Sequence, residues 1–183
     1  MTGYAAFLRG IMPSNPNMRN EKLRAVFEGL GYEQVTTLLS SGNVTFQARE
    51  TASATLESRI QKALNTELGI PGGTLIRTRD QLHDLVASDP FPGLTHCRET
   101  YLTVTFIKGA HLDLAAVPKD ESPSPTIRVV AYDEAAGAIL SIIDNTDPNT
   151  PAFMSWVEKQ YGKDNVTTRT FLTVQKALKK LDS

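Results

Sequence analysis

Short apolar runs alternate with longer stretches of helical periodicity along the first half of the chain. The runs are bounded by glycine, proline and turn-forming residues and predict strands at residues 4–8, 35–39, 44–48 and 74–78. Apolar residues recurring every three or four positions predict amphipathic helices that begin near Asn20, Leu56 and Asp80. The resulting order is strand, helix, strand, strand, helix, strand and an extra helix, which is the split β-α-β or ferredoxin-like plan.

The second half of the chain repeats this order. Strands are predicted at residues 101–108, 127–132, 138–143 and 166–169, a helical turn at 112–117, and helices around Trp156 and from Phe171 to Leu181. Residues 6–10 resemble residues 105–109, and residues 78–82 resemble residues 168–172, at corresponding places in the plan. We therefore predict an α+β fold of two tandem ferredoxin-like (split β-α-β) units, each followed by an extra helix. Residues 1–90 form the first unit and residues 91–183 the second, with a linker at 89–93.

Alternation along one strand of the second unit predicts which side chains face the helices. Leu102, Val104 and Phe106 are expected on the helix side of the sheet, with Thr103 and Thr105 on the other side. The threonines suggest an open face that is not deeply apolar, which is mild evidence against its burial on another sheet.

The segment from Leu38 to Phe46, LLSSGNVTF, predicts a hairpin. Gly42 and Asn43 tolerate the positive φ that a two-residue turn requires, and the flanking residues suit strands. We therefore expect a tight two-residue turn at this point.

Composition limits the classes of function. The chain has 183 residues, 40% of them hydrophobic, and carries 19 Lys and Arg against 20 Asp and Glu. Proteins that bind nucleic-acid backbones in general show a basic stripe and a high isoelectric point, and no RNP-like block is present, so nucleic acid is an unlikely partner. A local basic patch is still compatible with this balance.

No cofactor or metal is predicted. Cys97 is the single cysteine, which excludes an internal disulfide and a thiolate zinc site, and the three histidines are scattered. Phosphate-binding loops, dinucleotide fingerprints and nucleophile elbows are absent. His96 and Cys97 are adjacent, but adjacent side chains seldom point at each other, so we expect an unreactive thiol. Without a signal peptide or an apolar run of about 18 residues, a cytoplasmic protein with no membrane contact is expected.

Several motifs resemble one family. Residues 7–11 (FLRGI), residues 40–46 (SSGNVTF), residues 76–78, residues 89–91 and residues 167–169 are similar to the signature of the bacterial domain of unknown function 1697 family, which reads LRGINVGG followed by QSGNVVF. The resemblance covers most of the chain and implies two ferredoxin-like units with no established activity.

The chain departs from the family pattern at three places. Residues 12–15 (MPSN) replace the usual Asn-Val-Gly-Gly, residues 170–172 (TFL) stand where members often carry Asn-Trp-Asn, and residues 151–154 lack an expected Gly-Arg-Ser-Lys stretch. If the polar C-terminal residues of the family serve a common ligand, this protein has lost part of that site.

Topology predicts one candidate site. In the split β-α-β plan the third strand runs antiparallel between the first two, so one end of the sheet gathers the end of the first strand, the hairpin turn, the loop at 11–17 and Gly72 and Gly73. The ligand-binding candidates there combine one cation with hydroxyls and amides, which suits a small polar or anionic ligand. They are Arg9, Ser14, Asn15, Asn17, Ser40, Ser41 and Asn43. Arg169, in the family-like stretch at 167–169, is a secondary candidate.

Several interpretations of this site stay open. Arg9 can pair with a carboxylate or loop carbonyls while the serines and asparagines satisfy turn and cap hydrogen bonds, which is the commoner arrangement at loop ends. Among functions, a non-catalytic binding module fits best. The alternatives are an enzyme of unknown reaction that uses the same pocket, whose catalytic residues the sequence does not identify, and a protein or nucleic-acid interaction module. The oligomeric state is not predicted.

Overall fold

The computed structural model describes residues 1–109 and 124–183. The described residues form a mixed α+β structure with two four-stranded antiparallel sheets and five α-helices. The chain divides into two compact units, one made of Met1–Asp80 with Lys176–Ser183 and the other of Gln81–Gln175. This division reflects which residues lie close together in space. The separation into two domains, residues 1–90 and 91–183, stays a prediction.

The first unit contains one sheet and the helices that follow its strands. Its elements are β1 (Thr2–Leu8), a short 3-10 helix (Pro16–Met18), α1 (Asn20–Gly29), β2 (Glu33–Leu38), β3 (Asn43–Ala48), α2 (Ser53–Leu68), β4 (Thr74–Thr78) and the start of α3 (Arg79–Ala87). The strand order is β2-β3-β1-β4, and every neighbouring pair is antiparallel. The strands and helices predicted from periodicity in this half are all present.

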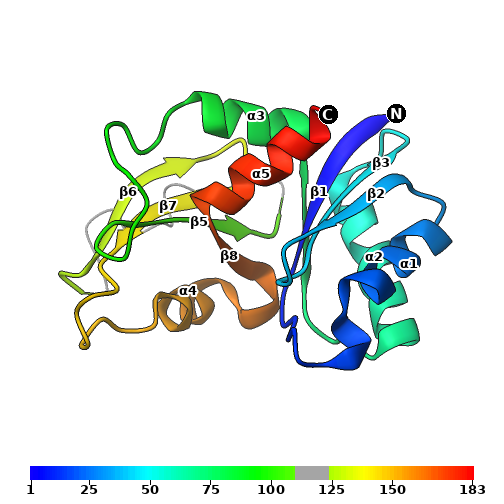
Figure 1. Ribbon diagram of the computed structural model, residues 1–183, viewed down its shortest axis with the longest axis horizontal. Helices are drawn as coiled ribbons and strands as arrows, with labels where there is room; N and C mark the ends of the chain where they lie inside the picture. Colours follow the sequence, from blue (N-terminus) through cyan, green and yellow to red (C-terminus); the bar gives the residue numbers. More distant parts are fainter. Residues whose placement is uncertain (110–123) are drawn as a thin grey trace. The chain divides into compact units, whose positions relative to one another are not determined.

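The core of the first unit lies between this sheet and helices α1 and α2, which cover the same face (Figure 1). Tyr4, Phe46 and Tyr32 form a row of stacked rings on that face, with centroids 5.6 Å and 4.8 Å apart. Phe27 of α1 meets Phe46 edge-on at 5.3 Å. Stacked and edge-on ring pairs of this kind add to the stabilisation from apolar burial.

Helix α2 also holds the outer edge of β4. Glu57 accepts a hydrogen bond from the backbone N–H of Ile76 at 3.0 Å, and Gln61 accepts one from the Thr74 hydroxyl at 2.8 Å. The Gln61 amide donates to the Ile70 carbonyl oxygen at 3.1 Å. The bond to Ile76 occupies a backbone N–H that the edge strand would otherwise leave unpaired, and the two bonds of Gln61 fasten the helix to the chain at and before the start of β4.

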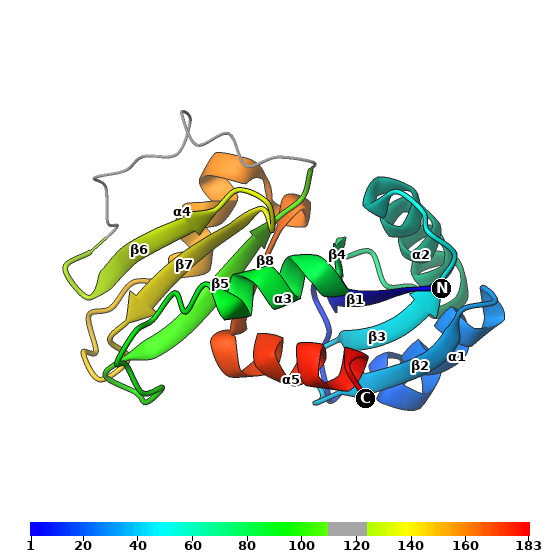
Figure 2. The same ribbon diagram turned by 90° about the horizontal axis from the view of Figure 1, so that it is seen from above.

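The second unit repeats the strand order of the first. Its elements are β5 (Tyr101–Ile107), β6 (Ile127–Asp133), β7 (Ala138–Ile143), α4 (Phe153–Tyr161), β8 (Val166–Thr170) and α5 (Phe171–Leu181), whose last residues belong to the first unit. The order is β6-β7-β5-β8, and α4 lies on one face (Figure 2). The helical turn predicted at residues 112–117 lies outside the described residues.

The prediction that Thr103 and Thr105 lie on the side of the sheet away from the helices is wrong with respect to α4. Ile107 packs in one cluster with Phe153 and Val157 of α4, so the odd-numbered residues of β5, including Thr103 and Thr105, share the α4 face. Both threonines are buried, at 2% and 0% exposure. Their hydroxyls pair with Ser141 at 2.7 Å and Thr168 at 2.8 Å, and this internal pairing lets a polar residue occupy a position that alternation assigns to the exposed side.

Candidate functional site

The hairpin turn is longer than the two residues predicted. Leu38 pairs with Asn43 across β2 and β3, so residues 39–42 make a four-residue connection. Positive φ occurs at Leu39 (59°) and Gly42 (79°), whereas Asn43 has joined the strand. The reason lies in the Asn43 side chain, which donates to the Leu38 carbonyl oxygen at 3.1 Å and to the Ser41 hydroxyl at 3.0 Å. Asn43 thus closes the turn from inside the strand, and only 2% of it is exposed.

Gly42 places this turn against the end of β1. Its carbonyl oxygen accepts a hydrogen bond from the Leu8 N–H at 2.8 Å. A β-carbon on residue 42 would lie 2.5 Å from Ile11 Cγ1 and 3.0 Å from Leu8 Cβ. Glycine is therefore required here for both its φ and its size, and the Gly-Asn pair of the family-like motif has a structural role.

A second glycine loop reaches the same end of the sheet. The Arg9 N–H donates to the Gly73 carbonyl oxygen at 2.8 Å, and a β-carbon on Gly72 would lie 2.1 Å from the Arg9 carbonyl oxygen. The structure thus brings Arg9, the hairpin turn and the Gly72–Gly73 loop together.

The other predicted residues of this end are placed around the loop before α1. Asn15 caps the short 3-10 helix by accepting the Asn17 N–H at 2.9 Å, and Asn17 accepts the Lys22 ammonium at 2.8 Å. Ser14 and Ser40 are exposed. The asparagine side chains at 15, 17 and 43 are therefore engaged in local hydrogen bonds of the fold.

Arg169 belongs to the second unit. Its guanidinium donates to the Thr167 hydroxyl at 2.6 Å and to the Thr168 carbonyl oxygen at 3.0 Å. These contacts hold the side chain along its own strand, β8.

A hollow of about 720 Å³ opens at the opposite end of the first sheet. It lies where β1 begins, where β3 and β4 end and where α2 starts. The residues that line it are Met1, Thr2, Gly3, Tyr4, Gln47, Glu50, Thr51, Ala52, Ser53, Thr78, Arg79, Asp80 and Leu181. Sequence reasoning missed this end because it followed the family-like motif; the same topology argument, applied to the start of the first strand, would have pointed to it.

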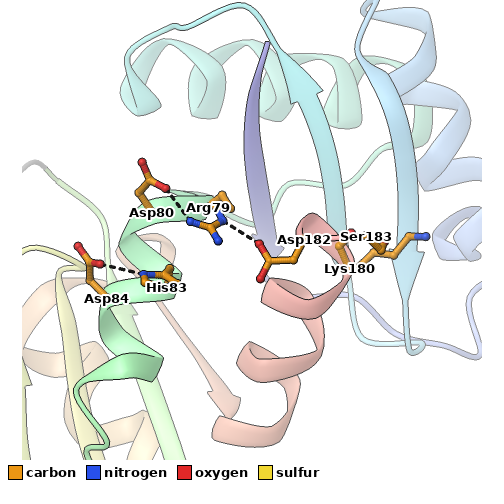
Figure 3. A network of polar contacts seen from close by, with 7 residues as sticks. All are labelled: Arg79, Asp80, His83, Asp84, Lys180, Asp182 and Ser183. Atoms are coloured by element: carbon orange, nitrogen blue, oxygen red, sulfur yellow. Dashed lines mark hydrogen bonds and ion pairs between the residues drawn. The ribbon is translucent and has the colours of Figure 1, made fainter.

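Arg79 is the cationic side chain of this hollow. It donates to Asp182 at 2.8 Å and to Asp80 at 3.1 Å, and Figure 3 shows the guanidinium between the two carboxylates. These hydrogen bonds raise the pKa of Arg79 above its ordinary value. The charge of Arg79 is thus largely balanced within the protein.

Cys97 and His96 do not form a reactive pair. The Cys97 thiol contacts the Thr100 hydroxyl at 3.1 Å, and the His96 ring accepts the Leu102 N–H at 3.1 Å. The contact with Thr100 lowers the pKa of the exposed Cys97 thiol. Each side chain is engaged with a partner other than its neighbour.

In the part of the chain that the structure describes, no group of three His, Cys, Asp or Glu side chains has the arrangement of a metal site. No helix in the same residues has both the length and the apolar character needed to cross a bilayer.

Comparison with protein families connects these features to known relatives. The family model "Protein of unknown function (DUF1697)" matches residues 1–135. The chain belongs to this family. The match to DUF1697 confirms the resemblance seen in the sequence motifs and includes the hairpin turn, Arg9 and the hollow at the opposite sheet end, apart from Leu181.

A solved structure extends the comparison over the whole chain. It is described as the structure of conserved bacterial protein SP0830 from Streptococcus pneumoniae, with a TM-score of 0.75 and 16% sequence identity, and it covers 100% of this chain and 99% of that one. At this identity the likeness establishes a shared fold. Comparison with curated proteins gives no match.

Proposed function

We propose that this DUF1697 protein is a non-catalytic binding module that takes a small polar or anionic ligand in the hollow beside Gly3 and Thr51. The observation that carries the proposal is the hollow itself. Its volume of about 720 Å³ falls in the range of small-molecule sites, roughly 300–1,000 Å³. The sheet end near Arg9, by contrast, engages three of its candidate side chains in turns and caps.

The lining supports binding rather than catalysis. It combines backbone from the first turn of α2 with the side chains of Gln47, Thr51 and Ser53. The N-cap residue of α2, Ala52, provides no side-chain hydrogen bond. The Thr55 N–H donates to the Ala52 carbonyl oxygen at 3.0 Å, which leaves the N–H groups of Ser53 and Ala54 for an acceptor. The lining contains neither histidine nor cysteine, so it does not combine a nucleophile with an imidazole base.

The end of the sheet near Arg9 is the second candidate location. Three backbone segments converge there, and Ser14 and Ser40 expose hydroxyls beside them. The two locations lie at opposite ends of β1, so substitutions at one do not touch the other.

Filling the hollow is expected to abolish ligand binding. A thermal-shift screen of metabolites and nucleotides, followed by native mass spectrometry, identifies ligands of the unmodified protein. Ser53→Trp places an indole in the hollow, and we expect it to remove the shift of every true ligand. Thr66→Trp on an exposed position of the same helix is the matched control and should keep the shifts.

The same screen tests the second location. Arg9→Ala should leave the shifts unchanged if ligands occupy the hollow. Shifts that survive Ser53→Trp but disappear in Arg9→Ala would move the site to the Arg9 end and contradict the proposal.

We also propose that both units are ferredoxin-like and arose by tandem duplication. Support comes from corresponding strand orders, β2-β3-β1-β4 and β6-β7-β5-β8, and from matching antiparallel pairs in each sheet. If residues 1–90 are a domain, a chain of these residues alone should unfold cooperatively on heating, as followed by circular dichroism. A gradual, non-cooperative loss of signal would contradict this division.

A further inference from the structure

Tyr32 links the end of α1 to the start of β2 and lies almost fully inside the first unit. Its ring stacks on Phe46 at 4.8 Å and meets Phe27 edge-on at 6.3 Å, and the residue is 8% exposed. The chain then bulges between Glu33 and Thr36, and Gln34 adopts a φ of 49°. The ring is thus held firmly while the strand beside it is irregular.

The hydroxyl of Tyr32 is buried without a hydrogen-bond partner among the described residues. The tyrosine on the other side of Phe46 behaves differently: the Tyr4 hydroxyl donates to the Thr51 carbonyl oxygen at 3.1 Å and accepts the Thr51 N–H at 3.0 Å. Buried polar groups are nearly always paired, so an unpaired one in a well-packed setting needs an explanation. An acceptor from a ligand is one such explanation.

Tyr32 lines a hollow of about 520 Å³ at the same end of the sheet. The other residues of this second hollow are Met1, Leu30, Gly31, Glu33, Ala48, Arg49, Thr51, Leu56 and Arg59. Within residues 1–109 and 124–183, neither the Arg49 nor the Arg59 guanidinium has an ion pair or hydrogen bond. Two arginines without an ion pair among the described residues therefore border a hollow whose lining includes Tyr32, the residue with the buried, unpaired hydroxyl.

We infer that this second hollow binds the phosphate group of a phosphorylated small molecule, held by Arg49, Arg59 and the Tyr32 hydroxyl. Guanidinium groups present several N–H donors in a fork that matches phosphate oxygens, and a tyrosine hydroxyl supplies a further donor. A phosphate monoester carries nearly two negative charges at pH 7, which complements two arginines.

The inference rests on the proposed function and narrows its ligand class. The second hollow shares Met1 and Thr51 with the hollow proposed above, so the two are neighbours, and the inference places one ligand across both. The guanidinium of the first hollow is already engaged, because Arg79 is paired with Asp80 and Asp182, and Glu50 adds a further carboxylate to the lining. In the second, two arginines face the single carboxylate of Glu33. The polar body of the ligand thus belongs in the first hollow and its phosphate in the second.

Inorganic phosphate is the probe that tests this inference without knowledge of the full ligand. In a titration at low ionic strength, with chloride at matched ionic strength as reference, we expect saturable changes in the amide NMR signals of Gly31, Tyr32, Ala48 and Arg49. Arg49→Gln with Arg59→Gln should weaken binding at least tenfold, because each charge-assisted bond contributes about a factor of ten. Arg19→Gln changes the same charge outside the lining and should keep the affinity.

Tyr32→Phe distinguishes ligand binding from a structural role. It keeps the stacked ring and removes only the hydroxyl, so we expect about tenfold weaker phosphate binding together with an unchanged or higher melting temperature of the ligand-free protein. Tyr161→Phe is the matched control. It removes a buried hydroxyl from the second unit, outside the lining of either hollow, so it should keep the phosphate affinity.

Three results would overturn the inference. The first is the absence of saturable changes in the amide NMR signals of the unmodified protein. The second is an unchanged phosphate affinity in both the double arginine variant and Tyr32→Phe. The third is a response centred on Gln34, Thr36 and Lys180, which line a neighbouring groove that Tyr32 also borders. None of these depends on the Ser53→Trp result, so phosphate binding can fail while the first hollow still binds a ligand, and the reverse is equally measurable.

Discussion

Replacing Glu57 with leucine is expected to lower the free energy of unfolding by about 3–5 kcal/mol, since it removes both a negative charge that favours the buried Arg77 guanidinium and the acceptor of the buried Ile76 N–H. Glu57 is 3% exposed and accepts the Ile76 N–H at 3.0 Å. Arg77 next along the strand is also 3% exposed. Burial lowers the pKa of Arg77 to about 10, and the negative charge of Glu57 opposes that shift. The carboxylate therefore both closes the edge of β4 and compensates a buried guanidinium.

Near neutrality, the stability lost in Glu57→Leu depends little on the pH of the measurement. Because burial lowers the folded pKa of Arg77 below the ordinary arginine value, the unfolded state holds the proton more tightly, and burial of the charge disfavours folding by its full amount at every pH below about 10. The contribution of Arg77 to stability would rise only as the pH increases above about 10, where the folded state loses the proton and the unfolded state still holds it. Urea denaturation at pH 7 thus measures the full effect of losing Glu57.

Two further variants separate the charge from the hydrogen bond. Glu57→Gln keeps an acceptor for the Ile76 N–H and should lose less stability than Glu57→Leu. Adding Arg77→Met to Glu57→Leu should restore part of the loss, because the buried charge is then gone as well. If Glu57→Leu and the double variant had the same urea midpoint at equal slopes, the pair would not be coupled.

Gly42→Ala is expected to lower the free energy of unfolding by about 3 kcal/mol, the sum of a left-handed backbone penalty of about 1–2 kcal/mol and a comparable overpacking cost. Residue 42 has a φ of 79°, and its β-carbon would lie 2.5 Å from Ile11 Cγ1. Either Ile11 or the turn must move to relieve that contact. The loss is measured by thermal or urea unfolding of the full chain.

Gly31→Ala provides the matched control for this prediction. Gly31 has a φ of 83°, but a β-carbon there would meet nothing within 4 Å. It should therefore lose only the backbone part, about 1–2 kcal/mol. Equal losses at the two positions would show that the contact with Ile11 has no energetic consequence and that the turn adapts freely.

The structural roles of Gly42 and Asn43 change the significance of the family motif at residues 40–46. Gly42 and Asn43 are explained by the closure of a four-residue turn and its packing on β1. The motif that identifies the family thus specifies how the first sheet is assembled. The two hollows to which the ligand is assigned lie elsewhere, at the end of the sheet where β1 begins.

Periodicity was sufficient to predict the strands and α-helices of the described residues. Apolar residues spaced for one helix face, such as Leu23 and Phe27, are buried in the core as expected. Length and flanking turn residues distinguished strands from helices, and strand order then placed Arg9 and the hairpin at one sheet end. Alternation failed at Thr103 and Thr105, because two internal hydroxyl pairs allow buried threonines.

The sequence by itself determined the α+β composition, the succession of strands and α-helices in the described residues and the family, because these depend on local periodicity and short motifs. Only the tertiary structure decided which polar side chains are engaged in turns and caps and which border a cavity. Asn43 and Tyr32 show the physical reason: each hydrogen-bonding group is satisfied or left unpaired by atoms brought close through the packing of strands and helices. Arg49 and Arg59 likewise become neighbours of one hollow only when the end of β3 meets the first turns of α2.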